Sequence, residues 1–116
     1  MTDQPTFPAY LFVVRNTVDP EHEAEFNRWY DEEHLPDAAS LPGCVGAARY
    51  QVLEGDGSHQ YLAVYAFASE AALRAALSGE RFRELARRYD AAVGAFSRRT
   101  RTTYRRITEL RPAGLS

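Results

Sequence analysis

A histidine flanked by carboxylates and aromatic rings is the most reactive combination in this sequence. Residues 26–37 contain the only tryptophan of the chain, one of its three histidines and four acidic side chains. An imidazole changes its charge near neutral pH, and a neighbouring carboxylate can fix which ring nitrogen carries the proton. His34 is therefore a candidate general acid or base, with Asp37 or Glu33 as the group that orients it and Tyr30, one turn earlier, as a further catalytic candidate.

The same histidine also has a purely structural interpretation. A histidine near the C-terminal end of a helix can donate hydrogen bonds to the last carbonyl groups, and it gains from the negative end of the helix dipole. The residue types and spacing around His34 leave both interpretations open.

Several aromatic side chains could surround such an imidazole. They come from the predicted strands and from the helix that carries His34, and they are Tyr10, Phe12, Trp29, Tyr61, Tyr65 and Tyr104. Phenols and aromatic rings together suit an apolar, oxygenated small molecule of an aromatic or polyketide-like kind. Each ring could equally belong to the hydrophobic core, and for Trp29 a packing role is favoured.

Other site chemistries have little support in the sequence. The three histidines are separated along the chain, and His34 with Asp37 provides at most two metal ligands. No glycine-rich phosphate motif follows the first predicted strand, so we predict neither a metal nor another cofactor. The single Cys44 cannot form an internal disulfide, and its neighbours provide no base that would activate it.

The charges are unevenly distributed. Residues 1–80 contain four arginines and thirteen acidic residues, whereas residues 81–111 contain ten arginines and three acidic residues. A basic C-terminal third could contact phosphates, but apolar and threonine residues interrupt it, and the acidic first helix could pair with it instead. We therefore expect no nucleic-acid partner.

The length and composition favour one domain covering residues 1–116, because 45 % of the residues are hydrophobic. No run approaches the roughly 20 apolar residues of a membrane helix. The first residues also lack the basic and apolar regions of a secretory signal. We therefore expect a cytoplasmic protein with no membrane partner.

Hydrophobic periodicity predicts the elements that must position the candidate residues. Strands are predicted at residues 10–18, 45–53, 60–67 and 97–110, and helices at residues 20–35, 70–77 and 80–93. A hairpin loop is predicted at residues 54–58, a flexible arm at residues 1–8 and a tail at residues 112–116.

The first predicted helix carries His34, so the positions of its two ends matter for the candidate site. Asp19 and Pro20 are typical of a helix start, and Pro36 predicts that the helix stops or kinks just past His34. On a helical wheel Glu33 falls within the inward group of residues, and His34 lies at the border of that group.

The element order strand-helix-strand-strand-helix-strand predicts a ferredoxin-like α+β fold, in which a four-stranded antiparallel sheet carries the helices on one face. The predicted strands are apolar on both faces, so the face without helices needs a cover. The simplest cover is the same face of a second copy, which predicts a homodimer.

Four short motifs carry a resemblance to a known superfamily: Trp29-Tyr30, His34-Leu35-Pro36, Leu41-Pro42-Gly43 and Arg49-Tyr50. With the element order, they make the chain similar to the dimeric α+β barrel superfamily, and most of all to its EthD-like branch and to the antibiotic-biosynthesis monooxygenases. The resemblance implies a barrel built by a homodimer, with a ligand pocket between the sheet and the helices of each subunit.

The resemblance also implies a range of activities. We expect a cofactor-independent enzyme that acts on its small-molecule substrate by acid/base chemistry of the lyase, isomerase or cyclase type. The alternatives are a cofactor-free monooxygenase of the antibiotic-biosynthesis type and a non-catalytic small-molecule-binding module, because superfamily membership fixes architecture better than chemistry.

Overall fold

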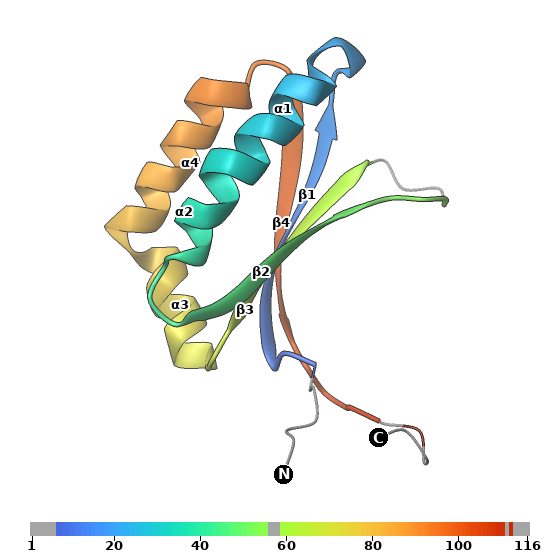
Figure 1. The fold of residues 1–116 in the computed structure, drawn as a ribbon. Helices are drawn as coiled ribbons and strands as arrows, with labels where there is room; N and C mark the ends of the chain where they lie inside the picture. Colours follow the sequence, from blue (N-terminus) through green and yellow to red (C-terminus); the bar gives the residue numbers. More distant parts are fainter. Residues whose placement is uncertain (1–6, 56–58, 111, 113–116) are drawn as a thin grey trace.

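The structure is a computed structural model that describes residues 7–55, 59–110 and 112, and its helices all lie on one face of a four-stranded antiparallel sheet (Figure 1). The strands, in the spatial order β2-β3-β1-β4, are β1 (Tyr10–Val18), β2 (Cys44–Gln51), β3 (Tyr61–Phe67) and β4 (Ser97–Arg105). The helical segments are a 3₁₀ turn (Pro20–His22), α1 (Glu23–Trp29), a π turn (Tyr30–His34), α2 (Leu35–Ala39), α3 (Glu70–Ser78) and α4 (Glu80–Val93). The predicted α+β ferredoxin-like fold is confirmed.

Some predicted segments extend beyond what the structure describes. Residues 56–58 of the predicted hairpin loop, residues 1–6 of the predicted arm and residues 113–116 of the predicted tail lie outside the described residues. The last strand is shorter than predicted, because Arg105 pairs with Tyr10, the first residue of β1, and β1 offers no partner beyond it.

The pairing register decides which side chains lie beneath the helices. Phe12 pairs with Tyr65, and both belong to the buried core on the helix side of the sheet. Val13 pairs with Val64 on the opposite side, and neither residue is part of that core. The sheet therefore has a covered face and an apolar second face, as the alternation in the strands predicts.

The first helix continues further than the sequence predicts. The segments α1, π turn and α2 follow one another without a break, so of the two expectations, a stop or a kink just past His34, the stop is wrong, and the irregularity that the structure shows is the π turn just before Pro36. The π turn closes with a hydrogen bond from the Leu35 N–H to the Tyr30 carbonyl, a wider loop than that of an α-helix. The wider turn gives the Pro36 ring room beside the preceding turn, which removes the clash that normally ends a helix at proline.

The π turn also changes which side chains point inward. Glu33 is exposed, although a regular helical wheel groups it with the inward residues, and His34 is partly buried. A wheel assumes a constant rotation per residue, and one wide turn breaks that assumption.

The ends of the other helical segments match the sequence signals in part. The Ser69 hydroxyl accepts a hydrogen bond from the Ala72 N–H at 3.1 Å, which confirms the predicted cap of α3. Pro20 begins the 3₁₀ turn as predicted, but the Asp19 side chain makes no capping hydrogen bond.

A single glycine allows the chain to turn from α2 into β2. Gly43 has a φ of +85°, and a Cβ atom at this position would lie 2.6 Å from the Cβ of Ala72. Both the backbone conformation and the close approach to α3 require a residue without a side chain. This turn aligns the His34 helix with the sheet.

No helix within the described residues has the length and hydropathy that are needed to cross a bilayer.

Candidate functional site

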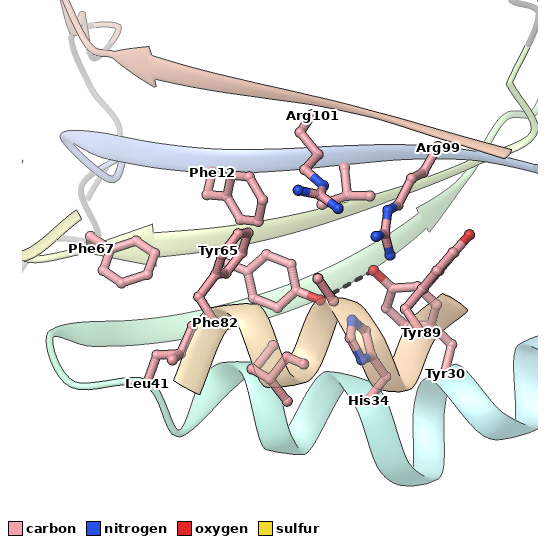
Figure 2. Close-up of a pocket in the computed structure, with 14 residues that line it drawn as sticks. Phe12, Tyr30, His34, Leu41, Tyr65, Phe67, Phe82, Tyr89, Arg99 and Arg101 are labelled. Atoms are coloured by element: carbon pink, nitrogen blue, oxygen red, sulfur yellow. Dashed lines mark hydrogen bonds between the residues drawn. The ribbon is translucent and has the colours of Figure 1, made fainter. Parts of the chain in front are cut away.

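A narrow cavity of about 30 Å³ lies between the sheet and the helices (Figure 2). Its wall is mostly apolar and aromatic, and its polar groups are one imidazole, three phenols and two guanidinium groups, from His34, Tyr30, Tyr65, Tyr89, Arg99 and Arg101. A water molecule needs on the order of 10–15 Å³ by the same measure, so the space holds water as it stands. A larger ligand requires side chains at the cavity mouth to move.

Aromatic rings hold the imidazole of His34 in place. It stacks on Trp29 with ring centroids 4.9 Å apart and an angle of 19° between the planes. Tyr30 and Tyr89 make edge contacts with it at centroid distances of 5.0 and 5.8 Å. Among the described residues none forms a hydrogen bond with either ring nitrogen, so the unprotonated nitrogen is available to a ligand.

The surroundings of His34 keep it neutral. Burial, and after it the positive charge of Arg99, lowers the pKa of His34 from 6.5 to about 4, and Asp37 opposes this shift only in part. A neutral imidazole at physiological pH has a lone pair that can accept a proton, whereas the imidazolium form that would act as a general acid is scarcely populated. Of the two roles that the sequence leaves open, acid or base, the structure favours the base.

Asp37 does not contact the imidazole in the way the sequence suggests. Its carboxylate accepts a hydrogen bond from Arg88 at 3.3 Å and lies 3.9 Å from a guanidinium nitrogen of Arg81. With Trp29 and Arg88 it lines a surface depression beside the cavity, and His34 borders both spaces. The ring is therefore oriented by stacking rather than by a carboxylate.

Two phenols meet at the cavity wall. The hydroxyls of Tyr30 and Tyr65 lie 3.2 Å apart, close enough for a hydrogen bond. Burial raises the pKa of Tyr30 to about 12, and burial also raises the pKa of Tyr65. Both therefore keep their protons near neutral pH, and the pair can donate a hydrogen bond to an oxygen of a ligand.

The structure brings only some of the predicted binding residues to this cavity. Phe12 and Tyr65 line it, and Trp29 supports it from outside through its stacking on His34. Tyr10 packs at the edge of the core, away from the cavity, and the Tyr61 hydroxyl accepts a hydrogen bond from Asn27 at 3.0 Å.

Tyr104 lies on the other face of the sheet. It pairs with Leu11, whose side chain points away from the helices, and its hydroxyl accepts a hydrogen bond from Arg15 at 3.2 Å. The structure therefore does not bring Tyr104 near His34. The alternation along the last strand is visible in the sequence, but the sequence does not say which of its two faces meets the helices.

Sequence reasoning missed the cavity residues of α4 and β4. Arg99 and Arg101 extend from β4 toward the helix layer (Figure 2). The Arg99 guanidinium carbon lies 3.9 Å from the centroid of the Tyr89 ring, and that of Arg101 lies 5.5 Å from the centroid of the Phe82 ring. The only sequence signal is that the two arginines are two residues apart on a strand, which places them on one face.

A buried chain of hydrogen bonds fixes Tyr89. The Asn16 amide donates to the Tyr89 hydroxyl at 3.1 Å, and that hydroxyl lies 2.7 Å from the Ser97 hydroxyl, which in turn donates to the Val93 carbonyl. Asn16 is fully buried. The chain links β1, α4 and β4, and it holds the Tyr89 ring between Arg99 and His34.

The predicted pairing of arginines with the first helix occurs in part. Arg81 and Arg88 of α4 pair with Asp37, and Arg49 of β2 pairs with Asp31 at 2.8 Å. Many other arginines pair within their own helix, as Arg83 does with Glu80.

No group of three or more potential metal ligands occurs in the part of the chain that the structure describes.

Comparison with protein families gives one match. A family model described as a domain of unknown function, DUF4286, matches residues 9–103. No curated protein sequence matches the chain.

The fold is shared with several solved structures. An EthD family protein from Bacillus halodurans superimposes with a TM-score of 0.67 at 13% identity, over 87% of this chain and 100% of that one. HapK from Hahella chejuensis gives a TM-score of 0.65 at 15% identity, over 90% and 99% of the two chains. A variant of SnoaB, a cofactor-independent oxygenase from Streptomyces nogalater, gives a TM-score of 0.59 at 25% identity, over 90% of this chain and 98% of that one. These neighbours confirm the resemblance to EthD-like and related proteins at the level of the fold.

Proposed function

The chain belongs to the DUF4286 family, and we propose that it is a cofactor-independent enzyme whose His34 removes a proton from an apolar, oxygenated small molecule. The observation that carries this proposal is a stacked, neutral imidazole at the wall of an aromatic cavity, with no hydrogen-bond partner among the residues that the structure describes. With a pKa of about 4 the imidazole is a weak base, so the reaction needs a substrate whose C–H or O–H points toward His34 and is made more acidic by the neighbouring groups.

The neighbouring groups support the same reaction. Removing a proton from a carbon beside a carbonyl puts negative charge on the carbonyl oxygen. The neutral hydroxyls of Tyr30 and Tyr65 can donate a hydrogen bond to that oxygen, and Arg99 adds a positive charge to the cavity. The aromatic wall favours a flat substrate of aromatic or polyketide-like kind.

The intermediate of this proton transfer has several fates. If the proton returns at another carbon, the enzyme is an isomerase, and if the carbanion attacks a second carbonyl or expels a leaving group, it is a cyclase or a lyase. All three use the same base and require no oxidant. We propose this group of reactions as the first candidate.

A cofactor-free monooxygenase is the second candidate, because SnoaB, at 25% identity, is described as a cofactor-independent oxygenase. In that case dioxygen reacts with the deprotonated substrate and oxidises it by four electrons, so that one oxygen atom becomes a carbonyl of the product and the other leaves as water with the two hydrogens that the substrate loses. Dependence of product formation on dissolved oxygen separates this candidate from the first.

The experiment that tests the role of His34 begins with a metabolite screen by thermal shift, which supplies a ligand. With a turned-over ligand, His34→Ala is expected to lower turnover by roughly 10²–10⁴ while binding is largely retained. His22→Ala, on the 3₁₀ turn outside the cavity, is the matched control and is expected to keep turnover. If His34→Ala retains both binding and turnover, the base is wrongly assigned. If ligands bind to the unmodified protein and none is converted, the non-catalytic binding module is the better description.

We also propose that the protein is a homodimer that buries the second face of the sheet. Val13 and Ala66 lie outside the core beneath the helices, and Tyr50 and Tyr104 remain 57% and 41% exposed. On this face Val13 and Ala66 are already buried within one chain, so the exposed rings of Tyr50 and Tyr104 are the surface that a second copy would cover. The cavity lies on the other face, so each subunit retains its own His34.

A further inference from the structure

The two arginines of the cavity have an unusual environment. Arg99 and Arg101 come from the same face of β4, and their guanidinium groups lie among Phe12, Phe82 and Tyr89 rather than in a ring of carboxylates. Figure 2 shows both side chains reaching from the strand toward His34 on the opposite wall. A positive charge shielded from water is unfavourable unless an anion accompanies it, and this applies to Arg99, whose side chain is 14% exposed, while Arg101 remains in contact with solvent.

The protein supplies little negative charge to this pair. The Arg99 guanidinium lies 3.3 Å from the Asp90 carboxylate, whose side chain is 69% exposed to solvent and which approaches from outside the cavity. Among the described residues Arg101 has no carboxylate partner, whereas Arg105, two residues later, lies 3.7 Å from Glu70. Burial and the charge of Arg101 both lower the pKa of Arg99, as expected for two cations that share one site.

The two side chains differ in how firmly they are held. Arg99 is anchored, with 14% of its side chain exposed, by its stacking on Tyr89, which the Asn16 chain of hydrogen bonds fixes in turn. Arg101 is exposed and lies over Phe82 at the cavity mouth. The pair therefore places one held cation inside the cavity and one exposed cation at its mouth.

We propose that Arg99 and Arg101 bind the carboxylate of an aromatic ligand, which narrows the substrate class of the proposed function to aromatic or polyketide-like carboxylic acids. This proposal rests on the proposed function, since it concerns the same cavity. Planar guanidinium groups bind carboxylates through paired, charge-assisted hydrogen bonds. The ligand ring then lies against Phe12 and Phe82, and its remaining polar groups face His34 on the helix side.

Salicylate is a suitable probe, because it carries a carboxylate and a hydroxyl on one ring, and salicylamide is its uncharged analogue of the same shape. Binding is measured by calorimetry and by NMR chemical-shift changes at several salt concentrations. The unmodified protein is expected to bind salicylate about tenfold more tightly than salicylamide. Arg101→Gln is expected to remove this preference, and so is Arg99→Gln. Arg99→Lys, which keeps the charge without the planar fork, is expected to weaken the preference without abolishing it.

Arg98→Gln is the matched control, because Arg98 is an exposed arginine on the same strand that points to the other face of the sheet. Both variants lose one positive charge. If Arg98→Gln weakened salicylate binding as much as Arg101→Gln does, the effect would be nonspecific electrostatic attraction, and the proposal would be overturned. Equal affinity for salicylate and salicylamide, or no binding of salicylate at millimolar concentration, would overturn it as well.

The two proposals fail separately. Salicylate binding that depends on Arg99 and Arg101, together with full turnover by His34→Ala, would refute the base and leave the carboxylate site intact. Loss of turnover in His34→Ala, together with equal binding of the charged and uncharged probes, would refute the carboxylate site alone.

Discussion

The neutral imidazole in the cavity predicts a specific dependence of stability on pH. The pKa of His34 is lowered to about 4 in the folded protein, from an ordinary value of 6.5, chiefly by burial. Between these two values the unfolded chain binds a proton that the folded chain does not bind, so protonation favours unfolding. The free energy of unfolding should therefore rise with pH across this window and become flat, as far as His34 is concerned, above it.

The size of the effect follows from the shift. Each pKa unit corresponds to 1.36 kcal/mol, so a shift from 6.5 to about 4 corresponds to at most about 3 kcal/mol. At about pH 5 the folded form is mostly neutral and the unfolded form mostly protonated, which gives a loss of about 2 kcal/mol relative to neutral pH. For a small domain this is a large part of the total stability.

The assay is urea unfolding of the unmodified protein and of His34→Gln at a series of pH values. The difference between the two free energies isolates His34, because every other residue is the same in both proteins. Glutamine cannot take up a proton, so the variant should lose about 2 kcal/mol less than the unmodified protein on going from neutral pH to about pH 5. His22→Gln controls for the loss of a histidine outside the cavity. If the free energies of unfolding of the unmodified protein and His34→Gln change in parallel with pH, the conclusion that the His34 imidazole is buried and neutral is refuted.

Three further predictions concern the scaffold. Gly43→Ala should destabilise the protein by about 1–3 kcal/mol, because φ is +85° and the new Cβ would lie 2.6 Å from that of Ala72; an unchanged midpoint in urea would contradict this close approach. Asn16→Ala should cost about 1–3 kcal/mol by removing the hydrogen bond to the Tyr89 hydroxyl, and thermal unfolding that matches the unmodified protein would show that the buried chain contributes nothing. Val64→Asp, on the face without helices, should dissociate or unfold the protein, and a monomer mass by light scattering for the unmodified protein at micromolar concentration would exclude the dimer.

Much of the fold could be predicted because local signals and the overall arrangement agree. The Ser69 cap predicted the start of α3, and the amphipathic pattern of residues 80–93 predicted both ends of α4, as the structure has them. The order of strands and helices then left few alternatives to the ferredoxin-like sheet. The cytoplasmic location, the homodimer and the roles of the site residues stay predictions.

The candidate site was only partly predictable because it depends on facts that are not local. The alternation of β4 was visible, but the pairing of Arg101 with Val14 decides that the arginines, rather than Tyr104, face the cavity. The sequence suggested that the arginines of residues 81–111 pair with the acidic first helix, since a sequence does not show which charges the fold leaves without a partner. The direction of His34 depended on a π turn, for which the sequence offered only the nearby Pro36 as a hint.

Because of the π turn, α2 does not continue the rotation of side chains about the helix axis that α1 would set in a uniform α-helix. The residues that face the sheet follow at steps of four, at positions 26, 30, 34 and 38. In a uniform α-helix each step of four overshoots a full circle by about 40°, so three steps would drift by about 120° around the axis. The wide turn takes up part of this drift and behaves as a single inserted residue. If the turn took regular α-helical geometry without losing a residue, everything after it would rotate by about 100° and His34 and Ala38 would leave the side that faces the sheet. Deletion of one residue from the turn would instead restore regular geometry and keep the later half in phase with the half that carries Phe26.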